Sequence, residues 1–145
     1  MSFAVDTNVL LRSIDDGHAA QPVVNEGLLT LRSQGETLSI FPQNLIEFWV
    51  VAKRPIANNG LGWSVDRGKV ELENLKYLFV VLAHTDVVFA EWERLVVHYR
   101  VAGKQAHDAH LVAAMLVHGI THLLTFNTND FKRFSEIMVV NPHNV

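Results

Sequence analysis

Acidic residues stand inside or directly beside apolar segments at four places in this chain of 145 residues. Asp6 follows the apolar residues 3–5, Glu47 interrupts the run 45–51, Asp108 begins the run 108–115, and Asp130 follows the segment 123–129. Desolvation destabilises a carboxylate in apolar surroundings, and two carboxylates ~4 Å apart repel by roughly 4 kcal/mol at an effective dielectric constant near 20. A divalent cation relieves this repulsion. Oxygen ligands without cysteine favour Mg²⁺ or Mn²⁺, and these ions act most often on phosphate oxygens.

Each of the four carboxylates also has a purely structural explanation. Asp6 suits a turn or a helix N-cap, and Asp108 in a first helical turn would favour the helix dipole. Asp130 closes a polar segment that is typical of a generic turn, and Glu47 could form an ion pair with the basic residues 53–54. The functional interpretation rests on the four positions meeting at one edge of one sheet.

The hydrophobic pattern indicates the elements that would bring them together. It predicts strands over residues 3–5, 37–41, 79–82, 122–125 and 137–140, and helices over 18–33, 43–54, 65–77 with Ser64 as N-cap, 86–100 and 106–118. Strands that alternate with helices predict one α/β domain over residues 1–145, with a mostly parallel sheet and helices on both faces. Ligands of such folds bind outside the carboxyl ends of the strands, where Asp6 and the segment 125–130 are expected.

Composition narrows the class of protein. Hydrophobic residues make up 49% and charged residues 19% of the chain, as in a folded globular protein, and no apolar run approaches the ~20 residues of a membrane span. The first residues lack the basic start of a signal peptide, and the absence of cysteine fits a cytoplasmic protein without disulfides or thiolate zinc sites. A net charge of −3 argues against strong non-specific nucleic-acid binding, so any RNA contact must use local basic groups.

Four segments resemble the motifs of one enzyme family. Val5-Asp6-Thr7-Asn8-Val9-Leu10-Leu11 is similar to the opening motif of PIN-domain ribonucleases, and Leu45-Ile46-Glu47 resembles their second acidic position. Residues 107–114, which contain Asp108, resemble the third motif, and residues 123–131 resemble the last. The four motifs occur in the family's order over nearly the whole chain. Because the resemblance covers nearly the whole chain and no second domain is predicted, the chain most resembles the VapC-type toxins of toxin–antitoxin pairs.

The resemblance implies a metal-dependent endoribonuclease that forms homodimers and is inhibited by a small antitoxin protein. Carried over to this chain, it implies that Asp6, Glu47 and Asp108 are catalytic and bind Mg²⁺ or Mn²⁺. Either Asp130 or Asn127 would complete the group. The residues that would orient these ligands are Thr7, Asn8 and Thr125. Many relatives have an acidic residue two positions after the threonine, where this chain has Asn127. That change removes one negative charge, and it argues against a second ion more than against the first.

Three alternatives stay open at this stage. A PIN-like domain can bind RNA or protein without cutting, and a PIN nuclease can process RNA as a housekeeping enzyme. The dipeptide His107-Asp108, followed by His110, is also typical of HD phosphohydrolases, but those enzymes are all-helical and the predicted strands count against them. The RNA target, its cleavage site and the antitoxin are not indicated by the sequence.

Overall fold

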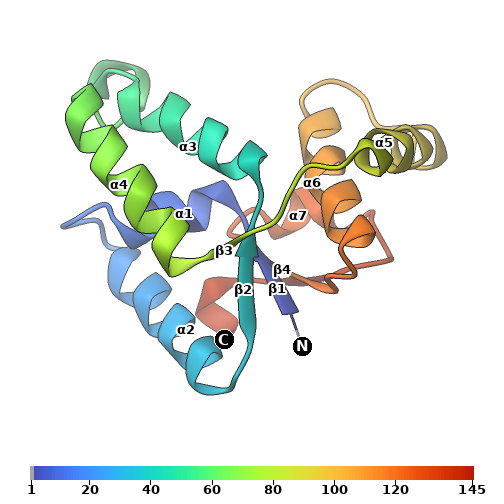
Figure 1. Cartoon of the computed structure of the whole chain (residues 1–145), viewed down its shortest axis with the longest axis horizontal. Coiled ribbons are helices and arrows are strands. Elements are labelled where there is room, and N and C mark those ends of the chain that lie inside the picture. Colours follow the sequence, from blue (N-terminus) through green and yellow to red (C-terminus); the bar gives the residue numbers. More distant parts are fainter. Residues whose placement is uncertain (1) are drawn as a thin grey trace.

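The central element of the fold is a parallel sheet, seen in a computed structural model that describes residues 2–145. Its strands are β1 (Ser2–Val5), β2 (Thr37–Ile40), β3 (Val80–Val81), β4 (His122–Leu124) and β5 (Met138–Val140), in the spatial order β3-β2-β1-β4-β5. All four neighbouring pairs are parallel. The α/β fold with a parallel sheet, predicted from the sequence, is therefore confirmed (Figure 1).

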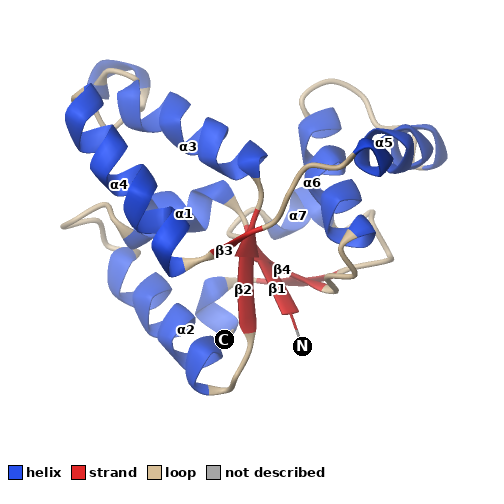
Figure 2. Ribbon diagram, viewed as in Figure 1, coloured by secondary structure: helices blue, strands red, loops and turns tan. Residues whose placement is uncertain are grey.

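Helices cover both faces of this sheet (Figure 2). They are α1 (Thr7–Ser13), α2 (Gln21–Ser33), α3 (Pro42–Lys53), α4 (Val65–Leu78), α5 (Asp86–His98), α6 (Gln105–Val117) and α7 (Thr128–Phe131), with short 3₁₀ turns at Ile56–Asn58 and Pro142–Asn144. In Figure 1, α1 to α4 lie on the left of the sheet and α5 to α7 on the right. The sheet thus separates two helical layers, and each layer has its own hydrophobic core.

The strands serve both cores because successive side chains point to opposite faces of a sheet. Val5 and Leu124 are fully buried in the core shared with α1 to α4, whereas their neighbours Ala4 and Leu123 are fully buried in the core shared with α5 to α7. Strands buried on both faces appear in a sequence as continuous apolar runs, which is the pattern found before Asp6 and before Thr125.

The main departures from the predicted elements lie at the carboxyl ends of β1 and β4. Residues 7–13 form α1, which was not predicted, and Thr128–Phe131 form α7 where a turn was expected. Both helices are too short for the hydrophobic period to show. Helix α2 begins at Gln21, with a proline in its first turn, rather than at residue 18. The other elements begin and end within two residues of the prediction.

Strand order reverses between β1 and β4, and we call the carboxyl edge of the sheet at this reversal the crevice. From β1 the chain continues through α1 and α2 to β2 on one side, whereas β4 is followed by α7 and β5 on the other. Asp6 extends the ladder by one step, since its backbone N–H donates to the Leu124 carbonyl at 2.9 Å. Ligands of open parallel sheets bind at such a switch point. Within residues 2–145, no helix is long and apolar enough to cross a membrane.

Candidate active site

Asp6 lies at the switch point and is held there through both of its carboxylate oxygens. It is the N-cap of α1: its Oδ1 accepts a hydrogen bond from the Thr7 backbone N–H at 2.8 Å. Its Oδ2 accepts from the Thr125 hydroxyl at 2.8 Å, across the boundary between β1 and β4. The side chain is only 9% exposed. The carboxylate is therefore buried, oriented and partly compensated by two donors.

Thr7 connects Asp6 to the second carboxylate, Glu47. The Thr7 hydroxyl donates to Glu47 Oε2 at 2.9 Å and accepts from the side-chain amide of Asn44 at 3.2 Å. Asn44 is fully buried, and its Oδ1 accepts from the Phe41 backbone N–H at 2.9 Å. The start of α3 and the start of α1 are thereby joined through one hydroxyl group, which orients Glu47 toward the crevice.

Gln43 fixes the other oxygen of Glu47 and joins α3 to α6. Its side-chain N–H group donates to Glu47 Oε1 at 3.0 Å and to the His107 carbonyl at 3.0 Å. Its own carbonyl oxygen is hydrogen-bonded to Nδ1 of His110. Both oxygens of Glu47 thus have donors, and Gln43 ties α3 to the first turn of α6, where Asp108 lies.

The Thr125 hydroxyl joins Asp6 to the turn that follows β4. It donates to Asp6 and accepts from the side-chain amide of Asn8 at 3.3 Å and from the Asn127 backbone N–H at 3.0 Å. The Oδ1 of Asn8 accepts from the Phe126 backbone N–H at 3.3 Å. These contacts shape the turn that leads from β4 into α7, which carries Asp130.

The four carboxylates act on one another electrostatically. Burial raises the pKa of Asp6, and hydrogen bonds from Thr125 and Thr7 lower it, while the charges of Glu47 and Asp130 raise it further. Burial, followed by the charges of Asp6, Asp130 and Glu47, raises the pKa of Asp108 to about 6. Four segments that are distant in sequence therefore bring their acidic side chains within electrostatic range of one another at the carboxyl edge of the sheet.

Comparison with a protein-family model decides which family this geometry represents. The model of the PIN domain matches residues 3–137, which is nearly the whole chain. The chain belongs to the PIN-domain family. PIN domains of the VapC type are nucleases, and they generally use divalent metal ions. No curated protein sequence matches this PIN domain significantly.

Solved structures resemble this PIN domain over its full length, at low sequence identity. VapBC2 from Rickettsia felis, bound to a DNA fragment from its promoter, superposes with a TM-score of 0.75 at 16% identity and covers 97% of this chain and 98% of that chain. VapBC-1 from nontypeable Haemophilus influenzae gives 0.73 at 15% identity and covers 98% of both chains. VapC20 from Mycobacterium tuberculosis, a toxin that cleaves the sarcin–ricin loop, gives 0.63 at 19% identity and covers 91% and 95%. These likenesses establish the fold.

The predicted site residues of this PIN domain lie around one point in the fold. Glu47, Asp108 and Asp130 approach Asp6 closely enough to affect its pKa or to have their own pKa affected by it. The side chain of Asn127 is exposed, and only its backbone N–H contacts Thr125. The roles of these residues as ligands, and the choice between Asn127 and Asp130, stay predictions.

The structural explanations considered for two carboxylates have different outcomes. Asp6 does cap α1, so its capping role and its place in the crevice coexist. Glu47 takes its hydrogen bonds from Thr7 and Gln43, whereas the Lys53 ammonium donates to the Trp63 carbonyl at 2.6 Å. Glu47 is therefore oriented by Thr7 and Gln43, and it does not pair with Lys53 at the end of its own helix.

The donor set of this PIN domain suits a hard cation. As the side chains stand in the described part of the chain, no three His, Asp or Glu side chains converge closely enough to coordinate one ion. Mg²⁺ does not require such a cage, because it keeps several waters and is usually held by one or two carboxylates together with substrate phosphates. The buried carboxylate of Asp6, with Asp108 and Asp130 in the same field, fits that mode of binding.

Three residues near the carboxylates were not identified from the sequence: Gln43, Asn44 and His84. The available signal for the first two was their position four and three residues before Glu47, on the same side of α3. His84 lies in the segment between β3 and α5 and carries no pattern of its own. It lines a hollow of about 870 Å³ together with Ile46, Glu47 and Val50 of α3 and with His107 and His110 of α6. We call this hollow the α3–α6 groove.

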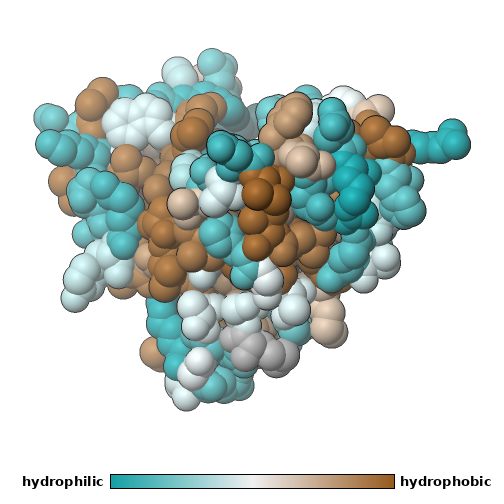
Figure 3. All heavy atoms as spheres, turned by 45° about the vertical axis from the view of Figure 1, so that its right-hand side comes forward, coloured by the Kyte–Doolittle hydropathy of each residue, from teal (hydrophilic) through white to brown (hydrophobic). Residues whose placement is uncertain are grey.

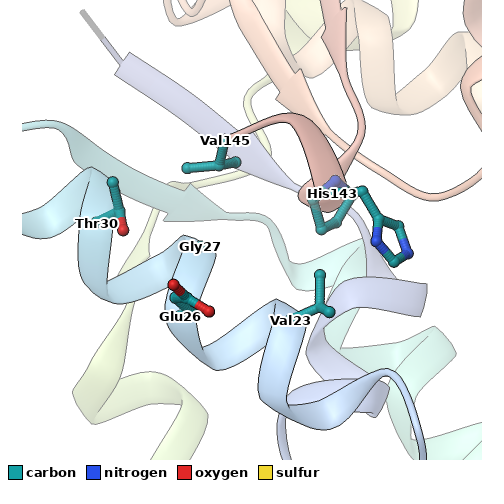
Figure 4. Close-up of a pocket in the computed structure, with 7 residues that line it drawn as sticks. Val23, Glu26, Gly27, Thr30, His143 and Val145 are labelled. Carbon is teal, nitrogen blue, oxygen red and sulfur yellow. The ribbon is translucent and has the colours of Figure 1, made fainter.

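A second hollow lies elsewhere in the molecule, between α2 and the C-terminal segment (Figure 4). It has a volume of about 210 Å³, and Figure 4 shows Glu26 and Thr30 on α2 with His143 and Val145 opposite. Gly27 belongs to its wall, and a Cβ at that position would lie in ordinary van der Waals contact, 3.5 Å from the Pro142 carbonyl oxygen. None of its lining residues belongs to the carboxylate group.

Proposed function

We propose that this PIN domain is a Mg²⁺- or Mn²⁺-dependent endoribonuclease and the toxin of a toxin–antitoxin pair. One observation carries the proposal: a buried carboxylate, Asp6, is fixed at the switch point of a parallel sheet by Thr7 and Thr125 and shares its field with three further carboxylates. A structural cap needs no such neighbours. A charge cluster of this kind is useful where a cation and a phosphodiester have to be held together.

In this proposal, Asp6, Glu47 and Asp108 hold the ion together with Asp130 or Asn127. When bound, the ion supplies a water of lowered pKa and neutralises charge that develops on the phosphodiester. Thr7 and Thr125 keep the Asp6 carboxylate facing the crevice, and Asn8 fixes the Thr125 hydroxyl. The protein side chains thus contribute orientation and negative charge, and the apolar strands behind them exclude water from one side.

The toxin role is supported by the agreement in fold, over nearly the full length, with VapBC complexes and with a toxin that cleaves RNA. An antitoxin would inhibit by placing a basic side chain, usually arginine, against the carboxylates, because charge-assisted hydrogen bonds to such groups are strong. We also propose, as the resemblance of the sequence motifs implies, that the protein acts in the cytoplasm as a homodimer.

The test is RNA cleavage with and without a chelator. The parent protein should cut total bacterial RNA in millimolar Mg²⁺ or Mn²⁺, and cleavage should stop when EDTA is added. Asp6→Asn should abolish cleavage, because it removes a buried charge and almost no volume. Asp66→Asn is the matched control, since Asp66 is an exposed carboxylate in the first turn of α4. A parent protein that binds RNA but leaves it intact under all these conditions would instead be a non-catalytic binding module.

A further inference from the structure

The α3–α6 groove adjoins the carboxylates because Glu47 belongs to both. Its volume of about 870 Å³ is within the range of pockets that hold a small organic ligand or one nucleotide. Apolar side chains of α3 remain open on its wall: Ile46 is 65% and Val50 is 51% exposed. On the face shown in Figure 3, hydrophobic surface runs through the middle of the molecule, with hydrophilic surface on both flanks.

Opposite α3, two imidazole rings stack face to face in this groove, which leaves the outer faces of the pair free to stack on a further ring. The rings of His84 and His110 are stacked, with centroids 5.0 Å apart and planes inclined by 17°. The His110 ring is fixed by its hydrogen bond to Gln43. His84 is exposed, but its backbone is held because the His118 ring donates a hydrogen bond from Nε2 to the Ala83 carbonyl at 2.8 Å. The stacked pair is therefore already in place before any ligand arrives.

Charge alone does not explain how this domain would hold RNA. The chain carries a net charge of −3, and the carboxylates beside the groove repel phosphate groups. Binding of a single strand must then draw on contacts that do not depend on charge. Proteins supply such contacts by stacking bases on aromatic side chains, histidine included, and by apolar walls. Arg54, at the end of α3, lines the same groove and offers a planar cation for a flanking phosphate.

We propose that the α3–α6 groove binds a nucleobase of single-stranded RNA next to the scissile phosphate, with the stacked rings of His84 and His110 as its stacking surface. This inference rests on the proposed nuclease function of the carboxylates. Glu47 forms the wall between the two sites, so a base in the groove places its own backbone beside the carboxylates. The groove would then help to select which nucleotide stands next to the cut.

The inference is tested by RNA binding, independently of cleavage. Asp6→Asn serves as the parent, and the probe is a short, fluorescein-labelled, single-stranded RNA of random sequence, followed by fluorescence anisotropy. Adding His84→Ala should weaken binding by about tenfold, as alanine substitution beneath a stacked base does. His84→Phe keeps a flat ring and should stay within about twofold of the parent. His98→Ala is the matched control, because His98 is an exposed histidine of α5 that does not line the groove.

An abasic strand of the same length separates base contacts from backbone contacts. It carries the same phosphates, so His84→Ala should not change its binding. The inference is overturned if His84→Ala binds RNA as tightly as the parent, or if the loss is equal on the abasic strand. It is also overturned if His84→Ala leaves RNA binding intact but releases the toxin from its co-expressed antitoxin, which would make the groove a protein-docking site. A wild-type chain that cuts no RNA refutes the nuclease proposal, and the binding results on the Asp6→Asn background can still be interpreted.

Discussion

At the scale of single residues, Asp6 combines an observed structural role with the role of metal ligand that we propose for it. Its Oδ1 caps α1, and its Oδ2 receives the Thr125 hydroxyl. The two donors offset part of the cost of burial, and yet the pKa of Asp6 stays raised. Because each oxygen already has one hydrogen bond, the carboxylate cannot turn away from its neighbours. The remaining lone pairs are what a cation would use.

Replacing Asp108 by asparagine should stabilise the metal-free protein near neutral pH. The pKa of Asp108 is about 6 in the folded protein, compared with roughly 4 in an unfolded chain. The folded state therefore holds this proton more tightly, which favours folding below about pH 4, and the benefit is lost as the pH rises through about 6. Asp108→Asn avoids that loss, so its advantage over the parent should grow from pH 4 to pH 7. Since the group is half-exposed, we expect on the order of 1 kcal/mol after solvent screening.

Chemical denaturation in EDTA at several pH values measures this difference. Asp66→Asn provides the comparison, since it removes an exposed carboxylate from the first turn of α4 and should not become stabilising as the pH rises. If Asp108→Asn were less stable than the parent at pH 7, the carboxylate of Asp108 would serve to cap α6 rather than to repel its neighbours.

Asp130 and Asn127 are the two candidates for the fourth ligand of the proposed metal site. The charge of Asp130 raises the pKa of both Asp6 and Asp108, whereas the Asn127 side chain is exposed. A ligand that binds only the folded state stabilises it by RT ln(1 + [L]/Kd), so Mn²⁺ should raise the melting temperature. Asp130→Ala should reduce that rise and weaken cleavage without abolishing it. Asn127→Asp should increase the rise by adding a charge at the edge of the site.

Thermal melts with Mn²⁺ and with EDTA measure both effects, and Asn129→Asp is the control, because Asn129 is an exposed residue of α7. An unchanged Mn²⁺ response in Asp130→Ala would leave three carboxylates and one amide, and would favour a single ion. If the parent protein melts at the same temperature with Mn²⁺ and with EDTA, the proposal of a metal site is refuted.

The acidic positions were predictable from the sequence because each breaks an apolar run, whereas their supporting residues were not. Gln43 contacts His107 and His110, which are 64 and 67 positions away. Asn44 contacts Thr7 across 37 positions. A polar residue in the first turn of a helix has many ordinary uses, and only the packing of α1, α3 and α6 around one point shows that these two orient Glu47.

At the scale of elements, the start of α3 is the part of the fold on which the site depends most. Phe41 and Pro42 end the extended segment, and the Asn44 side chain accepts the Phe41 N–H while its amide donates to Thr7. Asn44→Ala should therefore lower the free energy of unfolding by about 2–3 kcal/mol, because it removes a cap and leaves buried polar groups without partners. It should also lower cleavage, since Thr7 loses a contact that orients Glu47.

Urea denaturation and a cleavage assay measure the two effects. Asn74→Ala is the matched control, because Asn74 is an exposed asparagine inside α4 and its loss should stay within about 0.5 kcal/mol. A variant at Asn44 that keeps the parent's stability would show that the cap and the Thr7 contact are replaced by water.

The two elements that were not predicted share a physical cause. Helix α1 has seven residues and α7 has four, which is shorter than an isolated helix that would be stable in water. They form because neighbouring segments hold their first turns: Asp6 caps α1, and the Thr125 hydroxyl binds the turn before α7. These contacts belong to the candidate site, so the elements that the local sequence pattern fails to predict lie next to the proposed functional residues.

At the scale of the whole molecule, the fold was predictable because its central strands β1, β2 and β4 are largely buried and its helices are amphipathic or apolar. The strand order was not, because the pairing of β1 with β4 joins residues 3–5 to residues 122–124. That pairing places Asp6 beside Thr125 and creates the crevice. Part of the acidic excess behind the net charge of −3 lies at the crevice. The crevice therefore attracts cations and basic side chains.

Expression of this chain alone should therefore slow the growth of a bacterial host, and co-expression of the small gene next to its own should restore growth. The physical reason is that an arginine of the partner protein can neutralise the carboxylates and block access of RNA to them at the same time. Growth curves under an inducible promoter measure the effect, and Asp6→Asn, expressed to the same level, should be harmless without the partner. If the parent protein is soluble and cuts RNA but leaves growth unchanged, the chain is a housekeeping RNA-processing nuclease. Its carboxylates would then serve the same chemistry without an antitoxin.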